Sequence, residues 1–309
     1  MIVRLGYVSI SNTINLTTSK TITYKKFSKT NDYKLIDTII KNNLSNLTEI
    51  LKYNSSNNIH FYRISSNIIP LATHPNISFN YLDKYQIYYD KIARIINDKQ
   101  MRIDIHSSNY CIMSSTKEEV VNTSIKSLEY YYNLLKYMKV DNPLIILHIG
   151  SSTNGKEESI KRFINNINKL PKYIKNIIAI ENDDKIYNIE DIIKISKELN
   201  IPIILDYHHH LCNNINDIDN YLEDIINSWT NKRIKMHFST PKNNKNIRTH
   251  NDYIDSDKFI EFLSILQKYN KDIDIMIEAK QKDMALFKLI RELKYKTNYK
   301  FIDETTFEL

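Results

Sequence analysis

The stretch Ile201-Pro202-Ile203-Ile204-Leu205-Asp206-Tyr207-His208-His209-His210 joins a short apolar run directly to a carboxylate and three imidazoles. A buried strand that ends in such groups presents them from a rigid base, and both groups are ordinary ligands of divalent Mn, Fe or Zn. In an extended chain Asp206 and His208 share one face while Tyr207 and His209 share the other, unless the strand bends, so these side chains are not all equal ligands. Three adjacent histidines are often only a solvated surface segment, so the interpretation depends on how the other strands end.

Apolar runs of this kind recur and alternate with longer segments of helical spacing. The expected strands are residues 2–8, 60–66, 101–106, 144–150, 177–182, 201–207, 233–238 and 272–279. The expected helices are residues 33–53, 83–98, 117–139, 157–170, 188–199, 217–228, 257–269 and 282–295, each with apolar residues three or four positions apart. A length of 309 residues fits two domains or one large barrel. Strict alternation predicts the α/β class and a single (β/α)8 TIM barrel over residues 1–309.

The predicted strands end in similar chemistry. The second ends at Ser65 and Ser66, and the others with a polar ending close on His106, His148, Glu181, Asp206, His237 and Glu278. In a TIM barrel these ends meet at one mouth, where such enzymes place the active site. Buried carboxylates without partners are costly, so the sequence predicts several divalent cations at this mouth.

Further residues on the same rim leave alternatives open. His74 and His250 follow the second and seventh strands, where each is either a surface histidine or part of the site. Lys235 shares the strand face of His237 and therefore faces the barrel axis. It could pair with a carboxylate, stay neutral through desolvation or be carboxylated into a ligand, and the ion pair is the default.

Composition excludes several classes of protein. Hydrophobic residues make up 42% and charged residues 26%, which is ordinary for a globular protein. Only three glycines occur, which excludes a glycine-rich phosphate loop. The two cysteines, Cys111 and Cys212, form no disulfide framework, and the first residues look like a strand rather than a signal peptide. No uncharged apolar stretch approaches the ~18 residues that a membrane span needs, so we expect a cytoplasmic protein without a membrane partner.

The net charge of +7 favours a polyanionic partner, although part of it reflects the abundance of Lys, Asn, Ile and Tyr that an AT-rich genome encodes. Its placement is informative. Two long loops at the predicted mouth, residues 9–30 and 239–254, hold one acidic residue between them, Asp252. Their basic residues are Lys20, Lys25, Lys26, Lys29, Lys242, Lys245 and Arg248. A basic rim around a metal pocket predicts a phosphate-backbone substrate rather than a neutral sugar.

Motifs along essentially the whole chain resemble those of the UV damage endonucleases, DNA-repair enzymes of the UvdE/UvsE type. The matching segments are residues 4–9, 19–24, 62–66, 70–74, 181–185, 206–209, 235–239, 247–250 and 277–282. The resemblance implies a TIM barrel similar to endonuclease IV. It implies that the chain nicks double-stranded DNA immediately 5′ to cyclobutane pyrimidine dimers and 6-4 photoproducts, leaving 3′-hydroxyl and 5′-phosphate ends.

The same resemblance implies a cluster of three divalent metals, with Mn favoured and Zn, Mg or Co as alternatives. The implied ligands are His106, His148, Glu181, Asp206, His209, His237, His250 and Glu278, with His74 beside them. Glu181, Asp206, His237, Glu278 and Lys235 would be the catalytic residues, Lys235 matching a position that can be carboxylated. A metal-activated hydroxide would attack the phosphorus. His208 and His210 are not expected to be ligands.

Lesion recognition in the family uses base flipping, with a Gln-aromatic pair inserted from the loop after the third strand. The residues implied to contact DNA here are Tyr7, Lys20, Asn109, Tyr110 and Arg248. Tyr110 supplies the aromatic ring, but Asn109 is one methylene shorter than the usual Gln. Ser107 and Ser151 stand where Pro and Gly are typical.

Three other functions fit part of the pattern. An abasic-site endonuclease of the endonuclease IV type and a sugar isomerase of the xylose isomerase type share the predicted architecture, and the basic loops favour a nuclease over the isomerase. A non-catalytic DNA-damage sensor is disfavoured because binding alone has no use for so many converging acids and histidines. We expect a monomer, since one barrel face can hold a duplex unaided.

Overall fold

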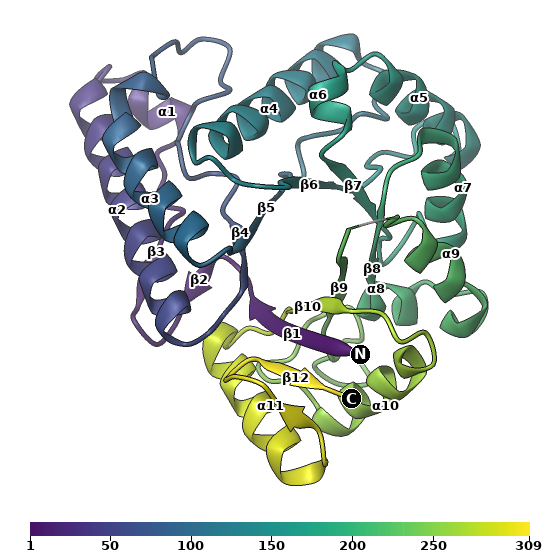
Figure 1. Ribbon diagram of the computed structural model, residues 1–309. Coiled ribbons are helices and arrows are strands. Elements are labelled where there is room, and N and C mark those ends of the chain that lie inside the picture. The colour runs from purple at the N-terminus through teal and green to yellow at the C-terminus, as the bar shows by residue number, and fades with distance from the viewer. Residues whose placement is uncertain (231) are drawn as a thin grey trace.

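The computed structural model describes residues 1–230 and 232–309 and forms a TIM barrel, with a ring of parallel strands surrounded by helices (Figure 1). The strands of the barrel are β1 (Ile2–Tyr7), β4 (Phe61–Ile64), β5 (Arg102–His106), β6 (Leu144–Leu147), β7 (Ile178–Glu181), β8 (Ile203–Asp206), β9 (Ile234–Phe238) and β10 (Ile273–Ile277). Each lies within a segment that the sequence predicts as a strand. The predicted fold class is therefore confirmed.

The helices between the strands also match the predicted segments. The long ones are α2 (Tyr33–Ser56), α3 (Gln86–Asp98), α4 (Glu118–Tyr137), α5 (Lys156–Asn168), α7 (Ile189–Leu199), α10 (Ser256–Gln267) and α11 (Lys282–Lys296). The predicted helix 217–228 is instead a 3-10 turn, η2 (Ile218–Asn220), followed by α9 (Leu222–Asn227). Short helices that the periodicity did not predict are α1 (Tyr24–Phe27), α6 (Lys172–Lys175) and α8 (Tyr207–Cys212). Among the described helices, none has the length and apolar character to cross a membrane.

The barrel closes between β1 and β4, where regular pairing is limited. Near the mouth, Val8 forms a parallel bridge with Arg63. Toward the opposite end β1 pairs antiparallel with β12 (Thr306–Glu308), which itself pairs with β11 (Lys300–Phe301). The two strands approach closely at Gly6, where a Cβ atom would lie 2.8 Å from carbons of the Phe61 ring. A larger residue at position 6 would therefore push the closing strands apart.

The segment after β8 differs from the sequence prediction. The strand ends at Asp206, and α8 begins at once with Tyr207. The Asp206 carboxylate caps this helix by accepting a hydrogen bond from the His209 backbone N–H at 2.8 Å. The chain therefore bends where the alternation of an extended strand would have continued, and helical spacing places residues three apart on one side. Asp206 and His209 consequently face the same site.

Alternation along the strands separates an apolar outer layer from a polar barrel interior. Outward residues such as Leu5, Ile103 and Leu205 are fully buried under the helices, and each contributes roughly 2 kcal/mol through its burial. Inside the barrel, Asp274 of β10 is also fully buried. The polar interior is thus enclosed by the ring of strands, whereas the helices cover the outer face of that ring (Figure 1).

Asp274 holds together the end of the barrel opposite the mouth. Its carboxylate accepts hydrogen bonds from Arg4 at 2.6 and 2.8 Å, from Arg102 at 2.8 Å and from Arg233 at 2.8 Å. Burial alone would raise the pKa of Asp274, but the three guanidinium groups lower it to about 2. The ionised carboxylate therefore links three strands at this end.

We predict that Asp274→Asn destabilises the protein by about 3 kcal/mol near neutral pH, because it leaves buried cations without their counter-charge. Folding lowers the pKa of this carboxyl from 3.8 to about 2, so its contribution is complete above about pH 4 and is lost as the pH falls through about 2. Urea unfolding at pH 7 and pH 3 measures both effects.

Asp272→Asn is the matched control, because the Asp272 carboxylate pairs with Arg233 at 3.1 Å but is half exposed. This variant should change stability by less than about 1 kcal/mol. Equal losses in the two variants would contradict the assigned role of Asp274.

Candidate metal centre

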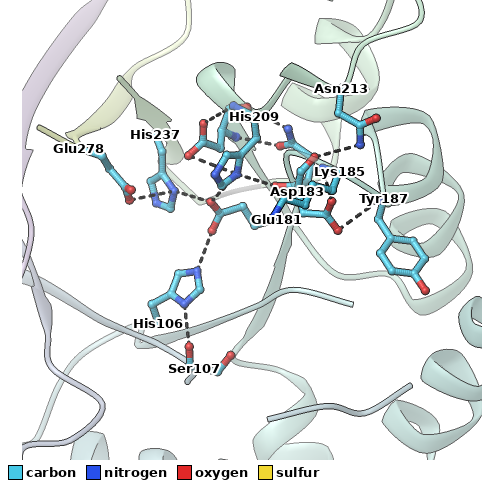
Figure 2. Close-up of polar contacts among 12 residues, drawn as sticks. His106, Ser107, Glu181, Asp183, Lys185, Tyr187, His209, Asn213, His237 and Glu278 are labelled. Carbon is cyan, nitrogen blue, oxygen red and sulfur yellow. Dashed lines mark hydrogen bonds and ion pairs between the residues drawn. The ribbon is translucent and has the colours of Figure 1, made fainter. Parts of the chain in front are cut away.

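The polar strand ends meet at the mouth of the barrel as predicted (Figure 2). Within the described residues, three overlapping groups have ligand atoms within 4.8 Å of one another. They are His106, His148 and Glu181; Glu181, Asp206 and His209; and Asp206, His237 and Glu278. The first two groups share Glu181 and the last two share Asp206. A carboxylate shared by two neighbouring groups could bridge adjacent divalent cations through its two oxygens.

Glu181 lies at the centre of the site. Its carboxylate is 3.0 Å from His106 Nε2, 3.1 Å from His237 Nδ1 and 3.6 Å from His209 Nδ1. Burial alone would raise the pKa of Glu181, but the surrounding histidines, His237 first, hold it well below its usual range. The carboxylate is therefore ionised at neutral pH.

Asp206 has an unsatisfied oxygen directed at the same site. Its side chain is fully buried, and Oδ2 has no hydrogen-bond partner among the described residues. Burial raises the pKa of Asp206 to about 6, although His209 opposes the shift. A buried carboxylate oxygen with no partner is costly, and a divalent cation would satisfy it. This orphaned atom is the strongest sign that the site fits a metal.

The histidines are oriented as metal ligands usually are. His106 Nδ1 donates to the Ser107 carbonyl at 2.9 Å, and His209 Nδ1 donates to the Asn182 carbonyl at 2.9 Å. A ligating histidine commonly donates one ring N–H in this way, which fixes the tautomer and leaves its other nitrogen free for a metal. Burial lowers the pKa of His148 to about 4, so its ring is neutral and able to bind a cation.

Asn182 and Arg63 support these ligands, although sequence reasoning assigned no role to either. The Asn182 amide donates to the Asp206 carbonyl and accepts from the Asp206 N–H, both at 2.9 Å. Arg63 forms an ion pair with Glu278, with 2.8 Å between Nη1 and Oε1, and donates to His237 Nε2 at 2.6 Å. Arg63 could have been found from the sequence, because it lies two residues before Ser65 and therefore shares the strand face that points into the barrel.

Lys235 lies one layer below His237. It forms a fully buried ion pair with Asp104, a residue that sequence reasoning missed, and its ammonium lies 5.5 Å from the centre of the Phe61 ring. Burial lowers the pKa of Lys235 to about 8 against the effect of Asp104. Of the alternatives considered for this lysine, the ion pair is the one seen. A direct catalytic role and carboxylation are proposals.

His250 and His74 are placed differently from the other expected ligands. The His250 ring centroid lies 4.9 Å from that of His208 and 6.4 Å from that of His209, so it borders the cluster. His74 instead stacks on Tyr24 with ring centroids 3.9 Å apart, and its Nδ1 accepts from the Asn76 N–H. Neither histidine belongs to the three ligand groups found among the described residues.

The residues expected to contact DNA divide into exposed and buried ones. Asn109 and Tyr110 project from the loop after β5, and 85% of the Tyr110 surface is exposed. Lys20 and Arg248 are also exposed. Tyr7 is fully buried, and its hydroxyl donates to Asn54 Oδ1 at 2.7 Å. Contact between Tyr7 and DNA is therefore not supported, because this strand position faces the helices rather than the mouth.

A pocket of about 350 Å³ lies between the exposed loop and the metal ligands. It is lined by Ser107, Ser108, Asn109, Cys111, Ile112, His148, Gly150 and Ser151. His148 thus borders both the pocket and the first ligand group. A ligand in this pocket would contact His148 and the loop after β5.

The chain is similar to known proteins over nearly its whole length. Residues 3–307 match the family model described as UV-endonuclease UvdE. A relative from Bacillus cereus (strain B4264), named UV DNA damage endonuclease, is 37% identical over 95% of each chain. A relative of the same name from Bacillus mycoides (strain KBAB4) is 36% identical over the full length of both chains.

Solved structures show the same barrel. The crystal structure of SacUVDE has a TM-score of 0.87 and 34% identity, covering 95% of this chain and 98% of that one. Endonuclease IV from Thermus thermophilus has a TM-score of 0.58 and 12% identity, covering 95% of this chain and all of that one. D-psicose 3-epimerase from Clostridium cellulolyticum has a TM-score of 0.52 and 11% identity, covering 75% of this chain and 78% of that one. The last two share the fold alone.

We predict that Glu181→Gln lowers the number of bound Mn²⁺ ions more than His106→Gln does, because Glu181 belongs to two ligand groups and His106 to one. Metal analysis after equilibrium dialysis against Mn²⁺ measures the stoichiometry. Glu158→Gln, at an exposed pair with Lys161 on α5, should bind as the wild type does. Equal losses in the Glu181 and His106 variants would contradict the bridging role.

Proposed function

The chain belongs to the UV-endonuclease UvdE family, and we propose that it nicks double-stranded DNA immediately 5′ to UV photoproducts, leaving a 3′-hydroxyl and a 5′-phosphate. The observation that carries this proposal is the line of ligand groups sharing Glu181 and Asp206 at the barrel mouth. A phosphodiester placed across such a line would meet neighbouring cations at its attacking and leaving oxygens.

Three divalent cations, most simply Mn²⁺, would occupy the three groups defined above. The donor atoms are imidazole nitrogens and carboxylate oxygens without a thiolate, which suits Mn²⁺. Bound cations would supply Lewis acidity, lowering the pKa of water and offsetting charge on the phosphate. His250, at the edge of the cluster, is proposed as a further ligand after a small movement of its loop.

The protein's own residues prepare this site. Glu181 and Glu278 are held ionised, since their neighbours keep the pKa of each below its usual range. Arg63 fixes Glu278 through an ion pair and fixes His237 by donating to its Nε2. The buried carboxylates would repel a DNA phosphate on their own, so substrate binding needs the cations and the exposed basic residues of the rim.

Lesion recognition is assigned to Asn109 and Tyr110. An exposed aromatic ring beside a pocket suits a flipped-base mechanism, in which Tyr110 would stack in the gap left by the damaged dinucleotide. Asn109 would reach one methylene less far than the Gln that is usual in the family.

The free cysteines Cys111 and Cys212 suit a reducing cytoplasm. Because each ligand group is complete within one chain, we also propose that it acts as a monomer.

We predict that Glu181→Ala and His237→Ala each reduce nicking more than roughly a hundredfold, because each removes a ligand. The assay uses Mn²⁺ and a duplex carrying one defined pyrimidine dimer, with circular dichroism to confirm folding. Undiminished cleavage by a folded, metal-loaded variant would refute the assignment. Faster cleavage of an abasic duplex by the wild type would favour the endonuclease IV type of activity instead.

We predict that Tyr110→Ala weakens the preference for damaged over undamaged duplex by roughly tenfold or more, since base stacking is worth about 1–3 kcal/mol. Competition binding with the two duplexes measures this preference. Tyr295→Ala is the matched control, because Tyr295 is 91% exposed on α11. If both variants keep the wild-type preference, the probe role of Tyr110 is wrong.

A further inference from the structure

The loop that follows β1 is held in place by side chains from two helices. Its strands β2 (Ile10–Ser11) and β3 (Leu16–Thr17) pair antiparallel. Asp283 of α11, which is fully buried, accepts from Ser11 Oγ at 2.8 Å and from the Asn12 N–H at 2.7 Å. The first part of this long loop is therefore an ordered hairpin rather than a mobile segment.

A second buried side chain, Asn43 of α2, fixes the loop where it carries Lys20. Asn43 Oδ1 accepts from the Lys20 N–H at 3.1 Å, and Asn43 Nδ2 donates to the Lys20 carbonyl at 2.9 Å. The same Nδ2 donates to the Ile68 carbonyl, at 2.9 Å, in the loop after β4. One fully buried amide thus joins two loops of the mouth.

The two hydrogen bonds to Asn43 fix the main chain of Lys20 and thereby the position of its Cα atom. Both main-chain polar groups of Lys20 are paired with Asn43, while its ammonium-bearing side chain is exposed. Without the amide, these partly buried main-chain groups would lose their partner, and the loop would shift to hydrate them. A preorganised contact residue binds more tightly because its ordering cost is met before the ligand arrives.

We propose that Asn43 is a positioning residue for DNA binding, which holds the Lys20 main chain so that the Lys20 ammonium meets the phosphate backbone of the substrate. This inference rests on the proposed function. It assigns to Asn43 an effect on affinity through Lys20, with no part in the chemical step.

The test is a double-mutant cycle of Asn43→Ala and Lys20→Ala on nicking of the single-dimer duplex with Mn²⁺. Each single variant should raise KM roughly fivefold with kcat unchanged, and should reduce the slope of log affinity against log salt by about one, as losing one phosphate contact does. The double variant should match Lys20→Ala alone, because the effect of Asn43 passes through Lys20.

Asn54→Ala is the control for lost stability. Asn54 is a fully buried asparagine on the same helix, but its amide oxygen accepts from Tyr7, which is itself buried. It should lower stability without changing KM or the salt slope. Should Asn43→Ala fail to fold, Asn43→Ser serves in the cycle, since the shorter hydroxyl side chain loses the paired contact to Lys20.

The outcomes separate this inference from the function on which it rests. A wild-type protein that neither binds nor nicks the dimer duplex would refute the proposed function. If the wild type nicks and Lys20→Ala raises KM, an Asn43 variant with wild-type KM would overturn the positioning role. Additive effects in the double variant would also overturn it, because Asn43 would then act independently of Lys20.

Discussion

The burial of several carboxylates at one end of a closed barrel is the constraint on which the rest of the mouth depends. Glu181 and Asp206 are almost fully removed from water and belong to the same ligand group. Two adjacent buried negative charges repel each other, and each loses its hydration. The surrounding histidines and Arg63 offset part of this cost, and a cation at the orphaned Asp206 oxygen would offset more. The arrangement is therefore understandable as a site selected for binding metal rather than for stability.

The layers beneath the mouth explain how the barrel tolerates this concentration of charge. Lys235 and Asp104 neutralise each other in the middle of the barrel, and Asp274 gathers three arginines at the opposite end. The barrel interior thus has two layers of paired charges, and the Asp206 oxygen without a hydrogen-bond partner lies in a third layer above them, at the mouth. Because the carboxylates of the lower layers already pair with side-chain cations, a bound divalent cation would interact chiefly with the mouth carboxylates.

The sequence predicted the features that repeat along the whole chain better than those that depend on a single residue. Strand–helix alternation identified the barrel, and the shared polar endings identified the ligands, because a parallel barrel brings strand ends together whatever loops separate them. The sequence allowed for a bend after Asp206 but did not predict helix α8, since the backbone period changes from two to 3.6 within one residue there. Tyr7 was expected at the DNA surface because its motif matches the family, but strand alternation directs it toward α2. Asn43 gave no signal, since a polar residue in a helix usually faces water.

The asparagines show why composition alone was a poor guide to this chain. With only three glycines, many tight turns rely on left-handed asparagines, among them Asn15, Asn31, Asn58, Asn142, Asn154, Asn200 and Asn270. Two buried asparagines instead hydrogen-bond to the main chain of another residue. Asn182 pairs with the N–H and carbonyl of Asp206, and Asn43 pairs with those of Lys20. The same amide geometry thus fixes a metal ligand inside the mouth and a basic residue on its rim. The high Asn content is consistent with an AT-rich genome, but it includes individual residues that position the site.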